Sequence, residues 1–341
     1  MAHAALVRLR AATAAAGVAL AWPAGADVRT STELAGASAS ASVSESASVM
    51  APVSAPVAVD ACRAPEPGAS TPRSPAAVLD DRVRAGRHWR LDTPRGPVHV
   101  WAPADYDAVT AATVVFVHGY WVDVDEAWGW YRLAQQFALS GINALFIAPE
   151  APSAKWDPVA WPALGDLVRA VATRVEVAMP GRRLVAVGHS GAYRTLARWL
   201  AEPALDTVVL LDAAYEDYGL LPWLRASPER RLVNIAYETG RFSSYLHRQI
   251  PGTVRVDGLP PGGLPDARVL YVQTAAGHWP LVTDGVALPL ALRAIGVPAA
   301  GSAPRDPVLG LVLGLPPADP ALALDWLARP PFAPRIDELP R

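Results

Sequence analysis

A serine stands where an apolar run turns directly into a helical pattern. Residues 184–187, Leu-Val-Ala-Val, have the pattern of a short buried strand, and residues 192–200 carry apolar residues at helical spacing. The turn between them, residues 188–191, is rich in small residues that let strand and helix approach closely. Such a turn exposes the hydroxyl of Ser190 above the sheet edge and points helical N–H groups at it. The pattern predicts a nucleophilic serine; the alternative is a glycine-rich turn with an inactive surface serine.

The segment Gly188-His-Ser-Gly-Ala192 resembles the nucleophile motif of the α/β-hydrolase superfamily, in its small-x-Ser-x-small form. The resemblance covers about residues 85–295. It implies the α/β-hydrolase fold, a mostly parallel central sheet with helices on both faces, and a catalytic triad in the chain order serine, acid, histidine. Ser190 argues against the branches of this superfamily that use an aspartate as nucleophile.

An upstream loop matches the second motif of this superfamily. Residues 113–117 form a buried-strand pattern that ends in His118-Gly119-Tyr120. The resemblance implies that one oxyanion-hole N–H comes from Tyr120, or Gly119, and the other from Gly191. His118 lies too early in chain order for the catalytic base, so we expect it to hold the loop by hydrogen bonds.

The superfamily places its catalytic histidine in the loop after the last strand. Residues 267–273 read as that strand, and His278 follows it, which completes the triad order. The alternative is a loop histidine without a role. The remaining histidines fit this position less well: His3, His88, His99, His189 and His247.

Two carboxylates are candidates for the acid. Asp212 follows the apolar strand 207–211, at the end where open α/β sheets gather functional groups, and Glu238 follows the strand 231–237. The superfamily uses either position. The sequence favours Asp212 and keeps Glu238 as the alternative acid, while a purely capping role for Asp212 also stays open.

Composition limits the remaining classes. With 341 residues and 52% hydrophobic residues the chain can bury a full core, and a net charge of −2 with a pI near 6.4 argues against nucleic acid as a partner. No metal-ligand spacing and no phosphate loop is visible, so we expect no metal and no cofactor. Lys155 is the only lysine among 30 basic residues, which indicates a coding bias rather than a function.

Four regions follow one another along the chain. Residues 1–26 have the pattern of a secretory signal peptide, which predicts a secreted or periplasmic protein, and no further segment has membrane-spanning character. Residues 27–79 read as a disordered Ala/Ser/Pro-rich linker, residues 80–296 as the hydrolase domain and residues 297–341 as a Pro-rich extension. Cys62 is the only cysteine, so no intrachain disulfide forms.

The expected elements alternate as in a doubly wound sheet. Residues 87–101 suggest an antiparallel edge hairpin, and further strands are expected at 113–117, 143–148, 183–187, 207–211, 232–237 and 268–273. Helices are expected at 125–140, 162–178, 191–201, 240–249 and 286–295. The insert 213–227 is a candidate for a small cap. Several tryptophans, either walling an aromatic cleft or packing between loops, fall near the predicted loops: Trp121, Trp128, Trp130, Trp156, Trp161, Trp223 and Trp279.

These features together predict a secreted serine hydrolase that cleaves carboxylic esters (class EC 3.1.1) through an acyl-enzyme intermediate, with a small ester or acyl compound as substrate. The sequence leaves two alternatives open. One is an exported binding protein that keeps the fold without chemistry, and the other is an amidase or peptidase.

Overall fold

The computed structural model describes residues 75–181 and 183–301. The predicted signal peptide, Cys62, most of the linker and most of the C-terminal extension lie outside these residues. Helix α1 (Pro75–Ala85) begins before the predicted domain boundary at residue 80. Ala299 also forms a β-bridge with Ile142, so the described part runs past residue 296. Among the described helices, none combines the length and apolar character needed to cross a membrane.

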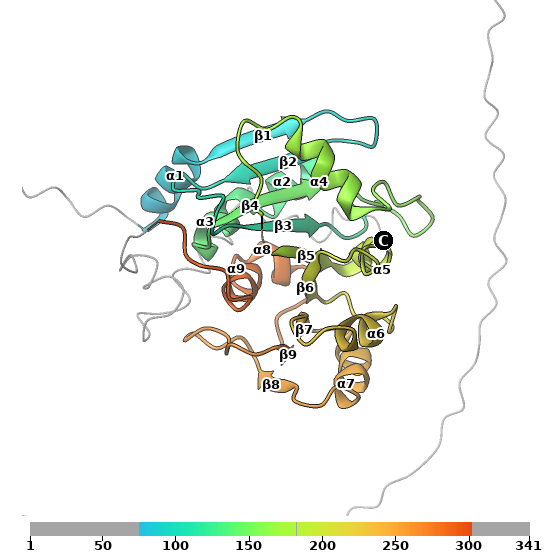
Figure 1. Cartoon of the computed structure of the whole chain (residues 1–341). Coiled ribbons are helices and arrows are strands. Elements are labelled where there is room, and N and C mark those ends of the chain that lie inside the picture. Colours follow the sequence, from blue (N-terminus) through green and yellow to red (C-terminus); the bar gives the residue numbers. More distant parts are fainter. Residues whose placement is uncertain (1–74, 182, 302–341) are drawn as a thin grey trace, which may run out of the picture. The chain divides into compact units, whose positions relative to one another are not determined.

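A nine-stranded sheet forms the centre of the described region, in the order β1-β2-β4-β3-β5-β6-β7-β9-β8. The first two strands form the predicted antiparallel edge hairpin, and β3 to β9 run parallel to one another (Figure 1). The strands are β1 (Arg87–Leu91), β2 (Val98–Ala102), β3 (Ala112–Val117), β4 (Ala144–Pro149), β5 (Leu184–His189), β6 (Leu205–Leu211), β7 (Arg231–Ala236), β8 (Val254–Asp257) and β9 (Val269–Gln273).

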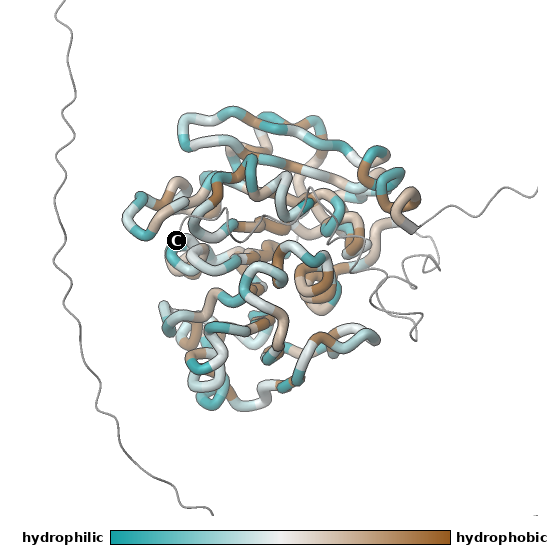
Figure 2. Tube along the Cα trace, turned by 180° about the vertical axis from the view of Figure 1, so that it is seen from behind, coloured by the Kyte–Doolittle hydropathy of each residue, from teal (hydrophilic) through white to brown (hydrophobic). Residues whose placement is uncertain are grey.

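Helices cover both faces of this sheet, because the inner strands are apolar on both sides. Val114 and Phe116 of β3 join one core cluster, and Val115 and Val117 join the other. The first cluster is closed by α1, α2 (Val124–Trp130), α3 (Leu133–Ser140), α8 (Pro280–Thr283) and α9 (Ala287–Arg293). The second is closed by α4 (Leu164–Ala172), α5 (Tyr193–Trp199), α6 (Leu220–Arg225) and α7 (Gly240–Arg248). Figure 2 shows the hydrophobic residues along the inner strands and the hydrophilic ones in the outer turns. The predicted fold class is confirmed.

Some local features differ from the prediction. The single helix expected over residues 125–140 is two helices, because Arg132 takes a left-handed φ of 51° between them. The insert 213–227 does not form a cap: α6 packs its leucines and Trp223 into the core. Strand β8 was not predicted.

All parallel strands end at the same edge of the sheet, and the loops that follow them meet there. The loop after β3 carries residues 118–121, and Ser190 follows β5 directly. Asp212 follows β6, and His278 lies in the loop after β9.

Candidate active site

Ser190 occupies a strained turn between β5 and α5. Its φ is +52°, in the left-handed region that costs a non-glycine residue roughly 1–2 kcal/mol, and it opens a short 3-10 turn, Ser190–Ala192. A Cβ on Gly188 would lie 2.6 Å from a Leu196 methyl carbon, and one on Gly119 would lie 2.8 Å from the Ser190 Cβ. Glycine is therefore required at both positions because the two segments approach closely. The positive φ of Ser190 is a form of backbone strain that is common at functional sites.

Asp212 is fully buried at the end of β6 and accepts hydrogen bonds from two directions. The backbone N–H groups of Tyr237 and Glu238 donate to it at 2.9 and 3.0 Å. The N–H and the hydroxyl of Thr239 donate at 2.8 and 2.7 Å. From the other side, Nδ1–H of His278 donates to Oδ2 at 2.6 Å. Asp212 therefore caps the turn after β7, not a helix of its own, and orients His278 as well.

These donors determine the charge of Asp212. Burial alone would raise its pKa, but the hydrogen bonds from His278, Thr239 and Tyr237 outweigh that effect and hold the pKa well below its usual range. The carboxylate is therefore ionised at neutral pH. Because it accepts the proton on Nδ1 of His278, the Nε2 atom is left as the basic nitrogen of the ring.

Glu238, the alternative acid, also lies near the imidazole. Its Oε2 is 3.9 Å from Nδ1 of His278, beyond hydrogen-bond distance, and its side chain is 57% exposed. Asp212 is 0% exposed and 2.6 Å away. The geometry thus favours Asp212 as the partner of His278.

A cavity of about 500 Å³ brings the candidate nucleophile and base together. Its lining residues are Tyr120, Trp121, Lys155, Ser190, Gly191, Tyr193, Tyr215, Glu238, His278 and Trp279. Within the described residues no hydrogen bond joins Ser190 to His278. The Ser190 hydroxyl instead interacts with the phenol of Tyr215. Burial raises the pKa of Tyr215, and the contact with Ser190 partly offsets that rise. Catalytic hydrogen bonds are often long without substrate, so this arrangement is compatible with a serine that turns toward the base.

Two of the residues predicted for the oxyanion hole, Tyr120 and Gly191, line the same cavity, whereas Gly119 is not among its lining residues. Gly191 is the second residue of the 3-10 turn, so its N–H has no acceptor within the turn. Gly191 packs against the Tyr120 ring, because a Cβ on Gly191 would lie 2.6 Å from atoms of that ring. Among the described residues we find no protein acceptor for the N–H of Tyr120, whereas the N–H of Trp121 donates to Ser153 at 2.8 Å.

Two further histidines support the loops of the site. His118 is buried; its Nδ1–H donates to the carbonyl of Gly119 at 2.8 Å and its Nε2 accepts from the N–H of Ala151 at 3.1 Å. His118 thus makes the loop contacts expected of it. His189 donates from Nε2 to the carbonyl of His278 at 3.1 Å. Burial and the neighbouring His278 lower the pKa of His189 to about 3, so it stays neutral.

Several residues of the cavity were not predicted. Tyr215 comes from the insert after β6, Tyr193 from the start of α5 and Lys155 from the loop after β4. No motif or spacing marks a single residue of this kind, although all three follow strands that end at the site. The tryptophans divide between the two expected roles: Trp121 and Trp279 line the cavity, while Trp161 and Trp223 are buried in the core.

Asp212, Glu238 and His278 also form a group that the sequence did not suggest. One potential ligand atom from each lies within 4.8 Å of the others, a spacing that a metal ion could use. In the structure Nδ1 of His278 is occupied by its hydrogen bond to Asp212.

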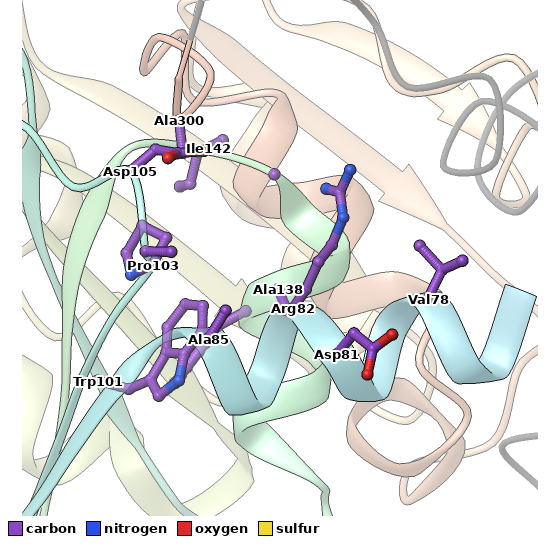
Figure 3. A pocket seen from close by; sticks show the side chains of 13 residues that line it. Val78, Asp81, Arg82, Ala85, Trp101, Pro103, Asp105, Ala138, Ile142 and Ala300 are labelled. Carbon is purple, nitrogen blue, oxygen red and sulfur yellow. The ribbon is translucent and has the colours of Figure 1, made fainter. Parts of the chain in front are cut away.

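A second cavity, of about 370 Å³, lies at the opposite edge of the sheet, where β3 and β4 begin (Figure 3). Trp101, Ala138 and Ile142 form part of its apolar wall, and Asp81 and Arg82 of α1 lie at its side. Its described lining contains no serine, cysteine or histidine, so it lacks the groups for acyl transfer.

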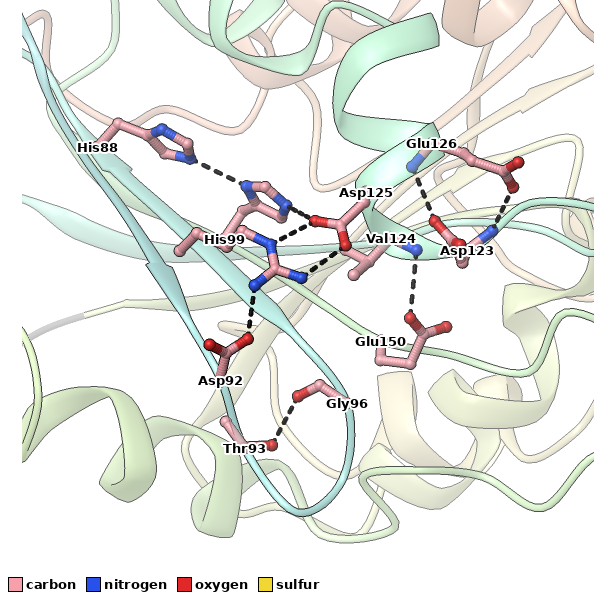
Figure 4. A network of polar contacts seen from close by, with 11 residues as sticks. His88, Asp92, Thr93, Gly96, His99, Asp123, Val124, Asp125, Glu126 and Glu150 are labelled. Atoms are coloured by element: carbon pink, nitrogen blue, oxygen red, sulfur yellow. Dashed lines mark hydrogen bonds and ion pairs between the residues drawn. The ribbon is translucent and has the colours of Figure 1, made fainter.

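No role was predicted for His88 and His99, but the structure joins them to an aspartate (Figure 4). Nε2–H of His99 donates to Asp125 at 2.7 Å, and Nε2–H of His88 donates to Nδ1 of His99 at 2.9 Å. Arg90 binds the same carboxylate through two nitrogens, at 2.8 and 2.7 Å. Trp128 stacks on both imidazole rings. This network fastens α2 to the edge hairpin.

No protein-family model and no curated protein matches the chain. Among solved structures, a thermostable carboxylesterase cloned from a metagenomic library has 14% identity and a TM-score of 0.40, over 65% of this chain and 97% of that one. A mutant feruloyl esterase module from Clostridium thermocellum with sinapinate has 10% identity and a TM-score of 0.42, over 61% and 88%. An S-formylglutathione hydrolase from Staphylococcus aureus has 14% identity and a TM-score of 0.40, over 62% and 95%.

The fold itself follows from the molecule's own topology. The sheet is parallel apart from its edge hairpin, and a serine elbow joins β5 to the next helix. Asp212 follows β6 and His278 follows β9, so that a serine, an acidic residue and a histidine come in the chain order typical of this fold. This chain therefore has the α/β-hydrolase fold.

Proposed function

We propose that the protein is a serine hydrolase that cleaves carboxylic esters, with Ser190 as nucleophile, His278 as general base and Asp212 as the acid that orients it. One observation carries the proposal. The buried carboxylate of Asp212 binds Nδ1 of His278 at the wall of the same cavity in which Ser190 is held at a positive φ. A serine, a base and an orienting acid in this relation are the groups that acyl transfer requires.

In the first half of the reaction, the Ser190 hydroxyl turns from Tyr215 toward Nε2 of His278 and gives up its proton as Oγ bonds to the ester carbonyl carbon. The carbonyl oxygen becomes an oxyanion that accepts hydrogen bonds from the N–H groups of Gly191 and Tyr120. Each such donor typically contributes about 100- to 1000-fold in rate. The bond to the alcohol oxygen then breaks as Nε2–H protonates that oxygen, and the acyl group stays on Ser190.

In the second half, a water molecule takes the place of the alcohol. Nε2 of His278 removes its proton as the water oxygen bonds to the acyl carbon. The bond from the acyl carbon to Oγ breaks, and Ser190 regains its proton from the imidazolium. Asp212 stays ionised throughout and stabilises the imidazolium, in accordance with its lowered pKa. Esters are the class we propose because an alkoxide is a far better leaving group than the nitrogen anion of an amide, so the same triad cleaves esters with less proton assistance.

Ser190→Ala tests the proposal. We expect hydrolysis of short p-nitrophenyl esters to fall by about a millionfold, the scale of nucleophile removal in such triads. The wild-type protein should react with a fluorophosphonate probe at Ser190, and the variant should not. Equal melting temperatures of the two proteins provide the control for folding, because Ala is small enough for the turn.

Each of the other outcomes would support a different function or mechanism for this protein. A variant that keeps more than a tenth of the esterase activity excludes Ser190 as nucleophile. Probe labelling with turnover of aminoacyl amides but not esters indicates an amidase or peptidase, and a folded protein without labelling or turnover indicates a binding protein. Esterase activity lost with EDTA and restored by a divalent metal would shift the chemistry to the group of Asp212, Glu238 and His278.

A further inference from the structure

The only lysine of the chain lies in the wall of the candidate active site. Lys155 belongs to the loop after β4 and lines the cavity that contains Ser190. Apart from Lys155 all basic residues of the chain are arginines, and the coding bias that this indicates does not explain why the exception lies here.

The loop that carries Lys155 is fixed on both sides. The carbonyl of Ser153 accepts from the N–H of Trp121 at 2.8 Å, and the Ser153 hydroxyl donates to the carbonyl of Val122 at 2.8 Å. These two contacts attach the loop to the segment that carries the oxyanion hole.

Helix α5 holds the other side of the same turn. Arg194 donates to the carbonyls of Ala154 and Asp157 at 3.4 and 2.9 Å, and the Asp157 carboxylate accepts from the N–H of Ala154 at 2.8 Å. The backbone at Lys155 is thus positioned relative to both the nucleophile helix and the oxyanion loop.

Within residues 75–181 and 183–301, the ammonium group of Lys155 forms no ion pair with an Asp or a Glu. Its Nζ lies 5.1 Å from the centre of the Trp156 ring. The other charged group of the cavity that is not part of the proposed triad, Glu238, lies beside His278. Aromatic side chains form most of the remaining wall, and Lys155 itself is exposed, so solvent partly screens an anion bound to it.

Resting on the function proposed above, we infer that Lys155 forms a subsite for a negatively charged group, so that the preferred substrates are esters bearing a carboxylate. A fixed loop beside the nucleophile presents a cation that has no carboxylate partner in the described part of the chain, and a substrate carboxylate supplies the missing charge. The carboxylate can stand on the acyl part or on the alcohol part of the ester. The two are separated by experiment.

The test compares charged and neutral substrates of the same shape. For the acyl side, p-nitrophenyl hydrogen adipate is set against its methyl ester; for the alcohol side, 4-carboxyphenyl butanoate is set against its methyl ester. We expect Lys155→Met to lower the ratio of kcat/KM for charged over neutral substrate by about fivefold on one side, the scale of one partly exposed ion pair. The loss should be in KM, Lys155→Arg should restore most of the ratio, and 0.5 M NaCl should reduce the ratio in the wild type.

Arg198→Met is the matched control, because it removes one positive charge from an exposed position of α5 outside the cavity. Its ratio should equal that of the wild type. Equal ratios in the wild type and Lys155→Met on both sides overturn the subsite, while Ser190-dependent ester cleavage would leave the proposed function intact.

A second measurement does not depend on turnover. Because Lys155 is the only lysine, reductive methylation with ¹³C-formaldehyde gives a single lysine signal in the NMR spectrum, apart from the terminal amine. In Ser190→Ala, monomethyl adipate should shift that signal and dimethyl adipate should not. Absence of any shift at millimolar monomethyl adipate overturns the acyl-side subsite even if no ester proves to be a substrate; 4-carboxyphenyl butanoate tests the alcohol side in the same way.

Discussion

The described part of the molecule holds two aspartate–histidine pairs with similar lengths and different surroundings. His278 donates to Asp212 over 2.6 Å, and His99 donates to Asp125 over 2.7 Å. The first pair uses Nδ1, so that Nε2 is free toward a cavity. The second uses Nε2, and the remaining ring nitrogen of His99 already accepts a hydrogen bond from His88.

The two aspartates also differ in what surrounds them. Asp212 is 0% exposed and is held by the backbone of the turn after β7, whereas the Asp125 side chain is 43% exposed and bound to Arg90. The comparison shows that a hydrogen bond between an aspartate and a histidine does not by itself identify a catalytic pair. A free ring nitrogen, a serine within the same cavity and a rigid buried acid distinguish a candidate catalytic pair from a structural one.

The largest effect is expected from changing the acid of the first pair. Asp212→Asn removes the charge and presents an amide N–H where the imidazole and three backbone groups donate, so His278 loses its orientation. We expect kcat/KM for a short activated ester to fall by roughly ten-thousandfold, the scale seen for a triad carboxylate changed to an amide. Rates are measured below the melting temperature of each protein, because the change also weakens the turn at residues 237–239.

Glu238→Gln is the matched comparison, since it removes a carboxylate 3.9 Å from the same nitrogen. Its effect should be far smaller, because an exposed charge without a hydrogen bond acts only through screened electrostatics. If Glu238→Gln proves the more damaging change, the two carboxylates exchange roles.

The second pair should affect stability and not chemistry. Asp125→Ala leaves the Nε2–H of His99, a residue only 4% exposed, without its acceptor. We expect a loss of about 1–3 kcal/mol in the free energy of unfolding, measured by urea titration. Asp125→Asn keeps an acceptor and should cost less. The activity per folded molecule should stay close to that of the wild type, because α2 keeps its own capping box.

A hundredfold loss of kcat/KM in Asp125→Ala, at a temperature where it is folded, would contradict the separation of the two pairs. It would mean that the edge hairpin acts on the oxyanion loop through α2.

The smallest expected effect is on the stability of the protein at acidic pH. Burial and the adjacent His99 lower the pKa of His88 to about 4 from an ordinary value of 6.5. In this pH range His88 binds a proton in the unfolded chain but not in the folded chain. The free energy of unfolding therefore falls as the pH drops from about 6.5 toward 4. Because only the ring of His88, which stacks on Trp128, is partly desolvated and the residue as a whole is exposed, the contribution should be about 1 kcal/mol or less after screening.

His88→Gln keeps a donor toward His99 and removes the titration. The pH dependence of its urea midpoint should be shallower than that of the wild type over this range. Parallel curves for the two proteins would show that His88 is not held neutral by the fold.

Much of the fold could be predicted because its signals are local. The inner strands are continuous apolar runs, and the elbow at Ser190 is a contiguous pattern. Strand β8 was not predicted because its four residues are exposed or half-exposed and lack an apolar run. The break at Arg132 was not predicted because an arginine with a positive φ does not alter the helical pattern of apolar residues.

The site was predicted where the chain order of a fold assigns its residues, and missed where only tertiary structure does. Ser190 and His278 come from ordered motifs, and the choice between Asp212 and Glu238 needed the geometry of the turn after β7. Tyr215 and Lys155 reach the cavity from loops after different strands, so no spacing along the chain connects them with Ser190.

The positive φ angles at the carboxyl edge of the sheet bear on how this protein can be engineered. Trp121, Ser190 and Asp212 have φ values of 77°, 52° and 51°, each in a region where glycine would be the less costly residue. Selection for heat resistance alone would therefore favour glycine at 121 and 190, and at 190 the gain would remove the proposed nucleophile. At 212 the hydrogen bonds from residues 237–239 to the carboxylate oppose such a change. Thermostable versions should be sought on the opposite edge of the sheet, where the cavity beside Trp101 leaves space that larger apolar side chains can fill without touching the elbow.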